Sequence, residues 1–290
     1  MIQRLCVIGV GLIGGSLARA LRDAGAVEHI VGCGRSAPNL IKAVEMGVID
    51  EYIVDAAEAV RGADMVVVAT ALSATPIIFA KIATAINATT VVTDVGSAKA
   101  RVVEAARRSF GDDFHQFVPG HPIAGTEKSG VEASFAELFQ EHRVILTPLA
   151  ETNPEALNRV AAMWKFAGAN GTEMDVEQHD KVLAATSHLP HMLAYALVDC
   201  LAKMDQSEDV FRYAAGGFRD FTRIASSSPE MWCDISLDNR EAILTVLDSF
   251  SATYERLRHA LENDNRDLLL EIFSGAKAAR ERAALPRSKA

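Results

Sequence analysis

Strand-like and helix-like segments alternate over the first 175 or so residues of this 290-residue chain, and this alternation is what most constrains its fold. Short apolar runs rich in β-branched residues are typical of strands and occupy 5–10, 29–33, 65–69, 90–95, 117–120 and 143–148. Ala-rich segments with helical spacing lie between them, at 14–25, 38–46, 73–85 and 98–109. Strands that alternate with helices form mostly parallel sheets, and strands that are apolar on both faces indicate helices on both sides. We therefore predict a doubly wound α/β domain over residues 1–174.

The alternation of strand and helix patterns ends near residues 173–177, and no further strand is predicted beyond that point. Segment 177–203 is predicted to be one long helix, with a kink or local irregularity at Pro190. Segment 237–262 carries an apolar seam whose members step by 4, 3, 4, 3 and 4: Ile243, Leu247, Phe250, Tyr254, Leu257 and Leu261. The seam fits a core face and a subunit interface equally well. Residues 175–290 are therefore predicted to form an all-α domain.

The charge balance argues against nucleic-acid partners. The chain has 29 Lys and Arg against 38 Asp and Glu, a net charge of −9, and an acidic surface repels phosphate backbones. The longest apolar runs, such as 65–72, fall far short of a membrane span, so no membrane partner is expected. The N-terminus lacks the pattern of a signal peptide. The cysteines contain no CxxC pair, which disfavours a zinc site and indicates buried free thiols in a reducing, cytoplasmic compartment: Cys6, Cys33, Cys200 and Cys233.

A glycine-rich turn joins the first predicted strand to the first helix. The sequence there is Gly9-Val10-Gly11-Leu12-Ile13-Gly14, the GxGxxG pattern in the context that dinucleotide binding requires. Gly9 permits the tight turn, Gly11 lets the backbone approach a pyrophosphate, and Gly14 lets the helix pack against the strand. Backbone amides at the helix N-terminus then face the phosphate charge. We therefore predict a Rossmann-type, dinucleotide-binding domain whose cofactor contacts are Gly9, Gly11, Leu12, Ile13 and Gly14.

The residues at the end of the second strand usually determine whether NAD or NADP binds. An Asp or Glu about 20 residues after the last glycine would hold a ribose 2′-hydroxyl. This chain has Gly34-Arg35-Ser36 there instead. A guanidinium beside a hydroxyl suits a 2′-phosphate, which favours NADP over NAD. In the alternative, Arg35 stacks on the adenine and tolerates both cofactors.

Two polar motifs follow strands at the carboxyl edge of the predicted sheet, where the nicotinamide should lie. His121 follows the strand at 117–120 and lies between Gly120 and Pro122, well placed as a general base. Ser97 follows the strand at 90–95. We expect it to orient His121 or a substrate hydroxyl. In the alternative, Ser97 caps the helix that begins after it.

The helical domain adds further candidates. His179 and the pair His188 and His191 lie on its first long helix, and no acidic residue at helical spacing completes a metal site beside the pair, so no metal is predicted. The stretch 218–225 holds two arginines among apolar residues, and we expect one of them to be a buried clamp for a carboxylate. In the alternative, the arginine forms an internal salt bridge to Asp220 or Glu127.

Together these motifs resemble the prephenate dehydrogenase family, which includes arogenate and cyclohexadienyl dehydrogenases. The matching segments run in the order of the family and cover nearly the whole chain: GVGLIGGSLA (9–18), DVGSAK (94–99), GHPIAGTEKSG (120–130), SHLPH (187–191) and GGFRDFTRIASSSPEMW (216–232). The resemblance implies oxidative decarboxylation of prephenate to 4-hydroxyphenylpyruvate in tyrosine biosynthesis, with NAD or NADP as the oxidant.

The resemblance also implies roles for individual residues. His121 accepts a hydrogen bond from the ring hydroxyl of the substrate and takes its proton, and Ser97 lies between His121 and the nicotinamide. Hydride leaves the same carbon, and loss of CO2 makes the ring aromatic. Thr126 and Glu127 line the substrate pocket, with Glu127 paired to Arg223.

The helical domain supplies the other implied contacts. His179, His191 and Arg223 meet the polar ends of the substrate, with Arg223 as the carboxylate clamp. Trp232 closes the pocket, and Gly216 is contributed across the interface of a homodimer. That family dimerises through its helical domain, which fits the apolar seam described above.

The resemblance leaves the substrate and the cofactor open. Many members carry an acidic residue at the position of Gly34-Arg35 and use NAD, whereas this sequence looks like the NADP-using arogenate branch. Prephenate and arogenate differ only in a ketone versus an ammonium group, and no residue is identified at that end. We expect neither a chorismate mutase segment before the glycine loop nor a regulatory module after the helical part. Two other classes stay open: an oxidoreductase for a different hydroxyacid that uses Lys181, and a non-catalytic dinucleotide sensor.

Overall fold

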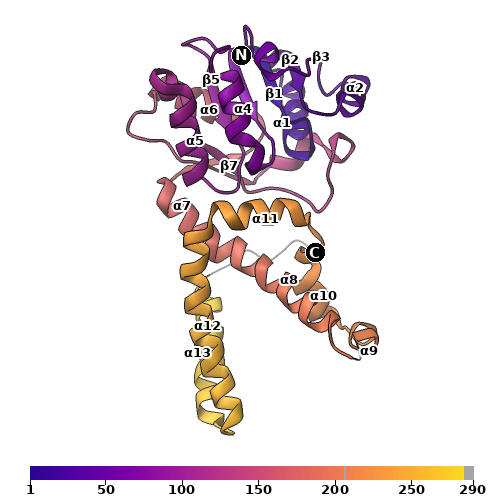
Figure 1. Ribbon diagram of the computed structural model, residues 1–290, viewed down its shortest axis with the longest axis vertical. Helices are drawn as coiled ribbons and strands as arrows, with labels where there is room; N and C mark the ends of the chain where they lie inside the picture. The colour runs from indigo at the N-terminus through magenta and orange to yellow at the C-terminus, as the bar shows by residue number, and fades with distance from the viewer. Residues whose placement is uncertain (206, 284–290) are drawn as a thin grey trace. The chain divides into compact units, whose positions relative to one another are not determined.

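The computed structural model describes residues 1–205 and 207–283 (Figure 1). Its strands are β1 (Ile2–Ile8), β2 (Val27–Cys33), β3 (Glu51–Tyr52), β4 (Met65–Val68), β5 (Val91–Asp94), β6 (Phe117–Val118), β7 (Gly120–Pro122), β8 (Arg143–Leu146) and β9 (Asn170–Glu173). Its α-helices are α1 (Leu12–Asp23), α2 (Ala37–Glu45), α3 (Ala56–Ala59), α4 (Thr75–Ile82), α5 (Ala100–Phe110), α6 (Pro154–Phe166), α7 (Val176–Leu183), α8 (Leu189–Ala202), α9 (Ser207–Arg212), α10 (Gly216–Thr222), α11 (Pro229–Asp238), α12 (Arg240–Glu262) and α13 (Arg266–Arg282).

Six strands form a parallel sheet in the order β3-β2-β1-β4-β5-β6, which confirms the predicted doubly wound plan. The strand order reverses between β1 and β4, so a ligand crevice is expected at the carboxyl ends of these two strands. One detail differs from the sequence prediction. The run at 143–148 gives β8 of a separate sheet, and the two-residue strand β3 occupies the edge of the parallel sheet.

The central strands bury alternate side chains on the two faces of the sheet. Leu5 and Val7 of β1 join the apolar cluster that α1, α2 and α6 cover, whereas Cys6 and Ile8 join the cluster that α3, α4 and α5 cover. Helices α4 and α5 contact each other over the second face and stand side by side in Figure 1. Burial on both faces explains why these strands appear in the sequence as continuous apolar runs.

A second sheet turns the chain back at the carboxyl edge of the first. Its order is β7-β8-β9, with β7 antiparallel and β9 parallel to β8. His121 is in the centre of β7 and pairs with Ile145 of β8. The predicted loop around His121 is therefore a short strand, and its backbone position is fixed by pairing as well as by the flanking glycine and proline.

The predicted helix over 177–203 is present but interrupted. Helix α7 ends at Leu183, and one π-helical turn, Ala184–His188, precedes α8. Pro190 lies in the first turn of α8, on the C-terminal side of this irregularity. Because a proline ring clashes with the preceding turn, the irregularity predicted at Pro190 is confirmed and lies just before it.

Contacts along the chain separate two compact units, residues 1–240 and 241–290. The domain division predicted between residues 174 and 175 stays a prediction, and residues 284–290 of the predicted second domain lie outside the described residues. In the second unit, α12 and α13 run side by side as a hairpin, and an ion pair joins Arg256 to Glu271 at 3.1 Å (Figure 1).

The apolar seam of α12 is only partly covered in the single chain. Ile243 is buried, whereas Phe250, Tyr254 and Leu261 are exposed. A row of exposed aromatic and aliphatic side chains favours the subunit-interface interpretation of the seam over the core-face interpretation.

The membrane and thiol predictions can also be compared with the structure. No helix in the described part of the chain is long and apolar enough to cross a membrane. Cys6 and Cys33 are buried free thiols, as predicted. The prediction is wrong for Cys200 and Cys233, which are exposed because each lies on an outward face of its helix.

Candidate active site

The glycine turn after β1 is shaped to leave room for a ligand. Gly9 has φ +101°, and a Cβ there would lie 2.3 Å from the Ala69 carbonyl oxygen. A Cβ on Gly14 would lie 2.2 Å from the Gly9 carbonyl oxygen, so only glycine allows α1 to approach the strand this closely. By contrast, a Cβ on Gly11 would meet nothing within 4 Å. The open space therefore lies beside Gly11, at the N-terminus of α1, where a pyrophosphate fits.

The first turn of α1 is available to that ligand. Gly11 is its N-cap, Leu12 and Ile13 follow it, and no side chain caps this first turn within the described residues. Amides without a protein cap are what an anion at a helix N-terminus requires. The residues present therefore fit a dinucleotide.

The segment after β2 places its polar groups beside the N-terminus of α2. The Ser36 hydroxyl caps α2 by accepting from the Asn39 amide at 3.4 Å. Arg35 is exposed, and Gly34 is partly buried against Leu40. An exposed guanidinium next to a capped helix start is accessible to a phosphate group.

A buried ion pair fixes the carboxyl end of β5. The Lys99 Nζ lies 2.5 Å from Asp94 Oδ2 and 2.7 Å from the Gly120 carbonyl oxygen. The Asp94 carboxylate also accepts from the amides of Gly96 and Gly120, at 2.8 and 3.2 Å. Burial lowers the pKa of Lys99, and the carboxylate of Asp94 opposes that effect. The pair therefore ties β5 to the residue that precedes His121.

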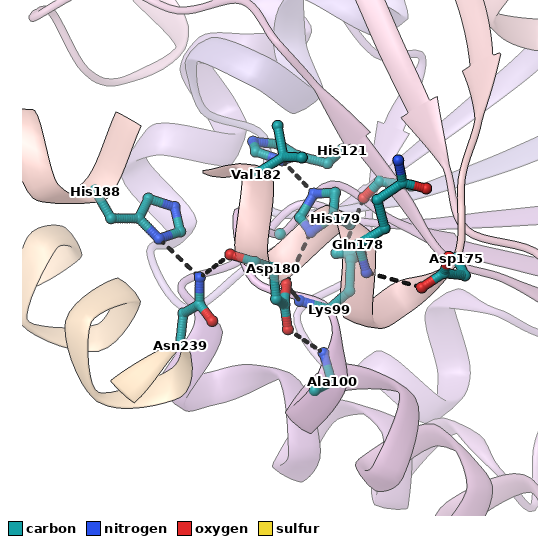
Figure 2. Close-up of polar contacts among 12 residues, drawn as sticks. Lys99, Ala100, His121, Asp175, Gln178, His179, Asp180, Val182, His188 and Asn239 are labelled. Atoms are coloured by element: carbon teal, nitrogen blue, oxygen red, sulfur yellow. Dashed lines mark hydrogen bonds and ion pairs between the residues drawn. The ribbon is translucent and has the colours of Figure 1, made fainter. Parts of the chain in front are cut away.

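His121 is buried and, within the described residues, has one side-chain hydrogen-bond partner. Its Nδ1 lies 2.9 Å from Nε2 of His179 (Figure 2). Burial holds the pKa of His121 well below its usual value, and the neighbouring His179, Lys99 and His188 act in the same direction. The imidazole is therefore neutral near pH 7, which is the form that a general base requires.

His179 is completely buried and has both ring nitrogens occupied. Its Nδ1 donates to Asp180 Oδ1 at 2.8 Å, and its Nε2 faces His121. Burial lowers the pKa of His179, although the Asp180 carboxylate opposes the effect. His179 thus has no free ring nitrogen for the substrate contact that the family resemblance implies.

Asp180 joins α7 to the start of α5. Its two carboxylate oxygens accept from the amides of Lys99 and Ala100, each at 2.9 Å. Asp180 therefore caps α5, and the alternative in which Ser97 caps this helix is wrong. The amides of Lys99 and Ala100 lie two and three residues after Ser97, where a capping serine would accept, but both donate to Asp180 instead. The role of Ser97 beside His121 stays a prediction.

The side chain of His188 is hydrogen-bonded to Asn239. The Asn239 amide nitrogen donates to the Asp180 carbonyl oxygen at 2.8 Å and to His188 Nδ1 at 3.0 Å (Figure 2). Burial lowers the pKa of His188 to about 4. Its Nε2 is buried, and a contact with the Ser97 backbone opposes part of this shift.

His191 and Trp232, which the family resemblance implies as substrate contacts, lie against each other. Their rings stack with centroids 3.7 Å apart, and His191 Nδ1 lies 2.9 Å from the Ser187 carbonyl oxygen. Burial lowers the pKa of His191, and the positive charge of Arg223 adds to this shift. His191, Trp232 and Arg223 therefore lie near one another, as the family resemblance implies.

Arg223 forms an ion pair with Glu127, which the sequence offered as a possibility. The prediction that one arginine of 218–225 is buried is wrong for Arg223, whose side chain is 65% exposed because it lies in a 3-10 turn, Arg223–Ser226, that has no buried residue. Thr126 is also exposed, and a Cβ on Gly216 would meet nothing within 4 Å. The roles given to Thr126, Glu127 and Gly216 stay predictions.

The structure also bears on Lys181 as a proton-transferring group and on metal binding. Lys181 is exposed and pairs with Glu177 on the same helix, which disfavours it as a proton-transferring group. In the described part of the chain, no cluster of three or more His, Cys, Asp or Glu side chains is placed to hold a metal ion.

Sequence analysis assigned no role to Asp94, Lys99, Asp180 or Asn239. Two signals were present: a carboxylate directly after an apolar strand, and an acidic residue next to His179. The signals point to local partners, His179 for Asp180 and Lys99 for Asp94, but not to the distant backbone groups that these side chains also bind.

The topology and the glycine turn define the class: a dinucleotide-binding α/β oxidoreductase with an added helical part. Residues 17–172 match the family model described as prephenate dehydrogenase, nucleotide-binding domain, and residues 175–275 match prephenate dehydrogenase, dimerization domain. The chain belongs to the prephenate dehydrogenase family. The predicted family and fold are confirmed, and dimerisation through the helical part is confirmed at the level of the family domain.

Individual relatives agree with this assignment. A cyclohexadienyl dehydrogenase of Zymomonas mobilis is 39% identical over 96% of this chain and 95% of its own length. A prephenate dehydrogenase of Bacillus subtilis is 37% identical over 97% of this chain and 76% of its own length. The crystal structure of prephenate dehydrogenase from A. aeolicus with hydroxyphenyl propionate and NAD+ has a TM-score of 0.90 and 36% identity, covering 98% of this chain and 99% of that one.

The buried histidines make stability depend on pH. Since the pKa of His188 is about 4 in the folded chain and about 6.5 when unfolded, the unfolded state takes up a proton first as pH falls. Stability is therefore lost from about pH 6.5 down to pH 4, and His188 alone costs about 2 kcal/mol at pH 5. Urea unfolding at pH 7.5 and pH 5.0 measures the loss, which is smaller by about this amount in His188→Gln. Equal stability at both pH values contradicts the prediction.

Proposed function

We propose that this chain oxidatively decarboxylates prephenate to 4-hydroxyphenylpyruvate with NADP. The observation that carries the proposal is the buried neutral His121, placed by β7 at the carboxyl edge of the sheet that the glycine turn opens. A base at that edge faces the expected position of the nicotinamide. The relatives named prephenate dehydrogenase support the substrate.

The protein residues act on the ring hydroxyl of the substrate. His121 accepts the hydroxyl hydrogen bond at Nε2 and takes the proton as the carbon is oxidised. The oxidised nicotinamide, when bound, supplies the acceptor for the hydride from that carbon. Loss of CO2 then makes the ring aromatic, which draws the reaction forward. Ser97 orients the hydroxyl from the β5 side.

The second group of residues binds the carboxylates and excludes water. Arg223 offers the guanidinium for a substrate carboxylate, and Glu127 holds that guanidinium in place before substrate arrives. Trp232 and His191 form a stacked wall, and Thr126 is a further residue of the pocket lining. His191 presents its Nε2 to a polar end of the substrate, because its Nδ1 is engaged by the Ser187 carbonyl.

Arogenate is the second candidate substrate. The 39% identical relative is named cyclohexadienyl dehydrogenase, and Glu127 is a carboxylate that could face an ammonium group. Its existing pair with Arg223 favours prephenate, because a satisfied carboxylate gains less from a second cation.

Three further proposals complete the assignment. The chain acts as a homodimer through residues 175–290, since the α12 seam exposes apolar side chains. The division between the nucleotide-binding and helical domains lies at residues 174 and 175. The free thiols support a reducing, cytoplasmic location.

The experiment combines prephenate or arogenate with NAD or NADP and follows the absorbance of reduced nicotinamide. Turnover fastest with prephenate and NADP supports the proposal, and no turnover in any of the four mixtures overturns it. Arg35→Gln is expected to raise KM for NADP about tenfold and leave KM for NAD unchanged, because a charge-assisted phosphate contact is lost. Arg61→Gln, an exposed arginine before β4, is the matched control. Equal effects on both cofactors contradict the role of Arg35.

A further inference from the structure

A chain of three hydrogen-bonded side chains ends at His121. Asp180 Oδ1 accepts from His179 Nδ1 at 2.8 Å, and His179 Nε2 lies 2.9 Å from His121 Nδ1 (Figure 2). All three side chains are less than a tenth exposed. The contact between two imidazole nitrogens requires one donor and one acceptor, so the position of every proton in this chain depends on Asp180.

The carboxylate determines the tautomer of His179. Two backbone amides and the His179 ring lower the pKa of Asp180 against the effect of burial, so the carboxylate is ionised and can only accept. His179 must therefore donate from Nδ1. Since His179 is buried and neutral, its Nε2 carries a lone pair and accepts.

The tautomer of His121 follows from that of His179. Nδ1 of His121 must carry the hydrogen that His179 Nε2 accepts. Because His121 is also neutral, its Nε2 holds the free lone pair. This is the nitrogen that a base needs for the hydroxyl proton, and the opposite tautomer would present an N–H there instead.

We propose that Asp180 and His179 are positioning residues that hold His121 in the tautomer with a free Nε2 and share the positive charge formed when it takes a proton. The proposal rests on the function proposed above, and it replaces the substrate contact inferred for His179. When the substrate hydroxyl loses its proton, the N–H bond forms at His121 Nε2. The resulting charge is shared through Nδ1–H with His179, next to the Asp180 carboxylate.

The charged neighbours explain why a carboxylate is needed at this point. Lys99, also buried, faces both imidazoles and disfavours a positive charge on them, and His188 acts on His121 in the same direction. Asp94 and Asp180 oppose them at His179. Asp94 is already paired with the Lys99 ammonium, so Asp180 is the carboxylate in hydrogen-bond contact with the histidine pair.

The first experiment measures tautomers directly, without substrate. Nitrogen-15 NMR of the full chain labelled at its eight histidines distinguishes Nδ1–H from Nε2–H rings. The variants His121→Asn and His179→Asn assign the two sets of signals. The proposal requires Nδ1–H and a free Nε2 in both rings. An Nε2–H tautomer at His179 or His121 overturns it, whatever the activity of the chain.

The second experiment replaces Asp180 with Asn and measures kcat against pH. Asn keeps an oxygen for the α5 cap but lacks the negative charge, so kcat is expected to fall roughly 10- to 100-fold, part of what a general base contributes. The midpoint of the acidic limb is expected to move down by about 1 pH unit, because the charge that favours the protonated pair is gone.

The matched control is Asp175→Asn. The Asp175 side chain caps α7 one turn earlier by accepting from the Gln178 amide (Figure 2). Its backbone carbonyl accepts from the His179 amide at 2.9 Å, and the substitution leaves that backbone bond in place. Its replacement is expected to leave the pH profile unchanged. A merely structural Asp180 would lower the thermal midpoint and kcat without moving the acidic limb, and that result overturns the proposal. If the wild-type chain turns over neither substrate, the proposed function fails, while the tautomer measurement still tests the positioning role.

Discussion

Replacing His121 with Asn is expected to lower kcat by about 100- to 10,000-fold, because the reaction loses the residue that we propose as the base for the hydroxyl proton. The Asn side chain fits the space of the imidazole and can still donate to His179 Nε2, so the local packing persists. The glycine turn and the N-terminus of α1 are untouched. Dinucleotide affinity, measured by fluorescence or calorimetry, is therefore expected to match that of the wild-type chain.

The control for this variant is His142→Asn, which changes an exposed histidine before β8. It is expected to keep full activity. Near-normal turnover by His121→Asn would show that the proton leaves by another route. Loss of dinucleotide binding in the same variant would instead mean that His121 holds the fold of the cofactor edge.

Replacing Lys99 with Met is expected to lower the free energy of unfolding by about 3–5 kcal/mol, which is what breaking a buried ion pair costs. The methionine fills the space of the lysine stem, but Asp94 is left buried without its cation. The Gly120 carbonyl also loses its donor, so the strand that carries His121 is held less firmly. Urea unfolding at pH 7.5 measures the change.

Lys181→Met is the matched control, since Lys181 is exposed and its ion pair with Glu177 is open to solvent. Exposed pairs contribute little, so no measurable change is expected. If Lys99→Met and Lys181→Met unfold at the same urea concentration as the wild-type chain, the buried pair does not stabilise the cofactor edge.

The sequence predicts well those features that depend on local pattern. The glycine turn lies within a few residues of β1 and α1, so its spacing alone identifies it. The strands β1, β4 and β5 are continuous apolar runs because both faces are buried. Pro190 acts on the turn immediately before it, so the irregularity at Ala184–His188 could be predicted in place.

The features that the sequence does not reveal depend on contacts between distant residues. Asp180 caps α5 from 80 residues away, so the position next to Ser97 suggests a local cap where none forms. Strand β7 has three residues and gains its conformation only from pairing with β8. The exposure of Arg223 likewise depends on distant packing, because its neighbours Ile224 and Ala225 are partly buried while Arg223 in the same turn is exposed.

The hydrogen bonds from the amides of α5 to Asp180 limit how segments of this chain can be exchanged with those of a relative. Residues before position 174 supply His121 and the amides of α5, whereas residues after it supply His179 and Asp180. A chimera that exchanged the two segments between relatives at this point would divide the hydrogen-bonded chain of Asp180, His179 and His121 between two parents. The side chains that we propose to act together thus come from both matched family domains, residues 17–172 and 175–275, and a chimera should take both segments from one parent.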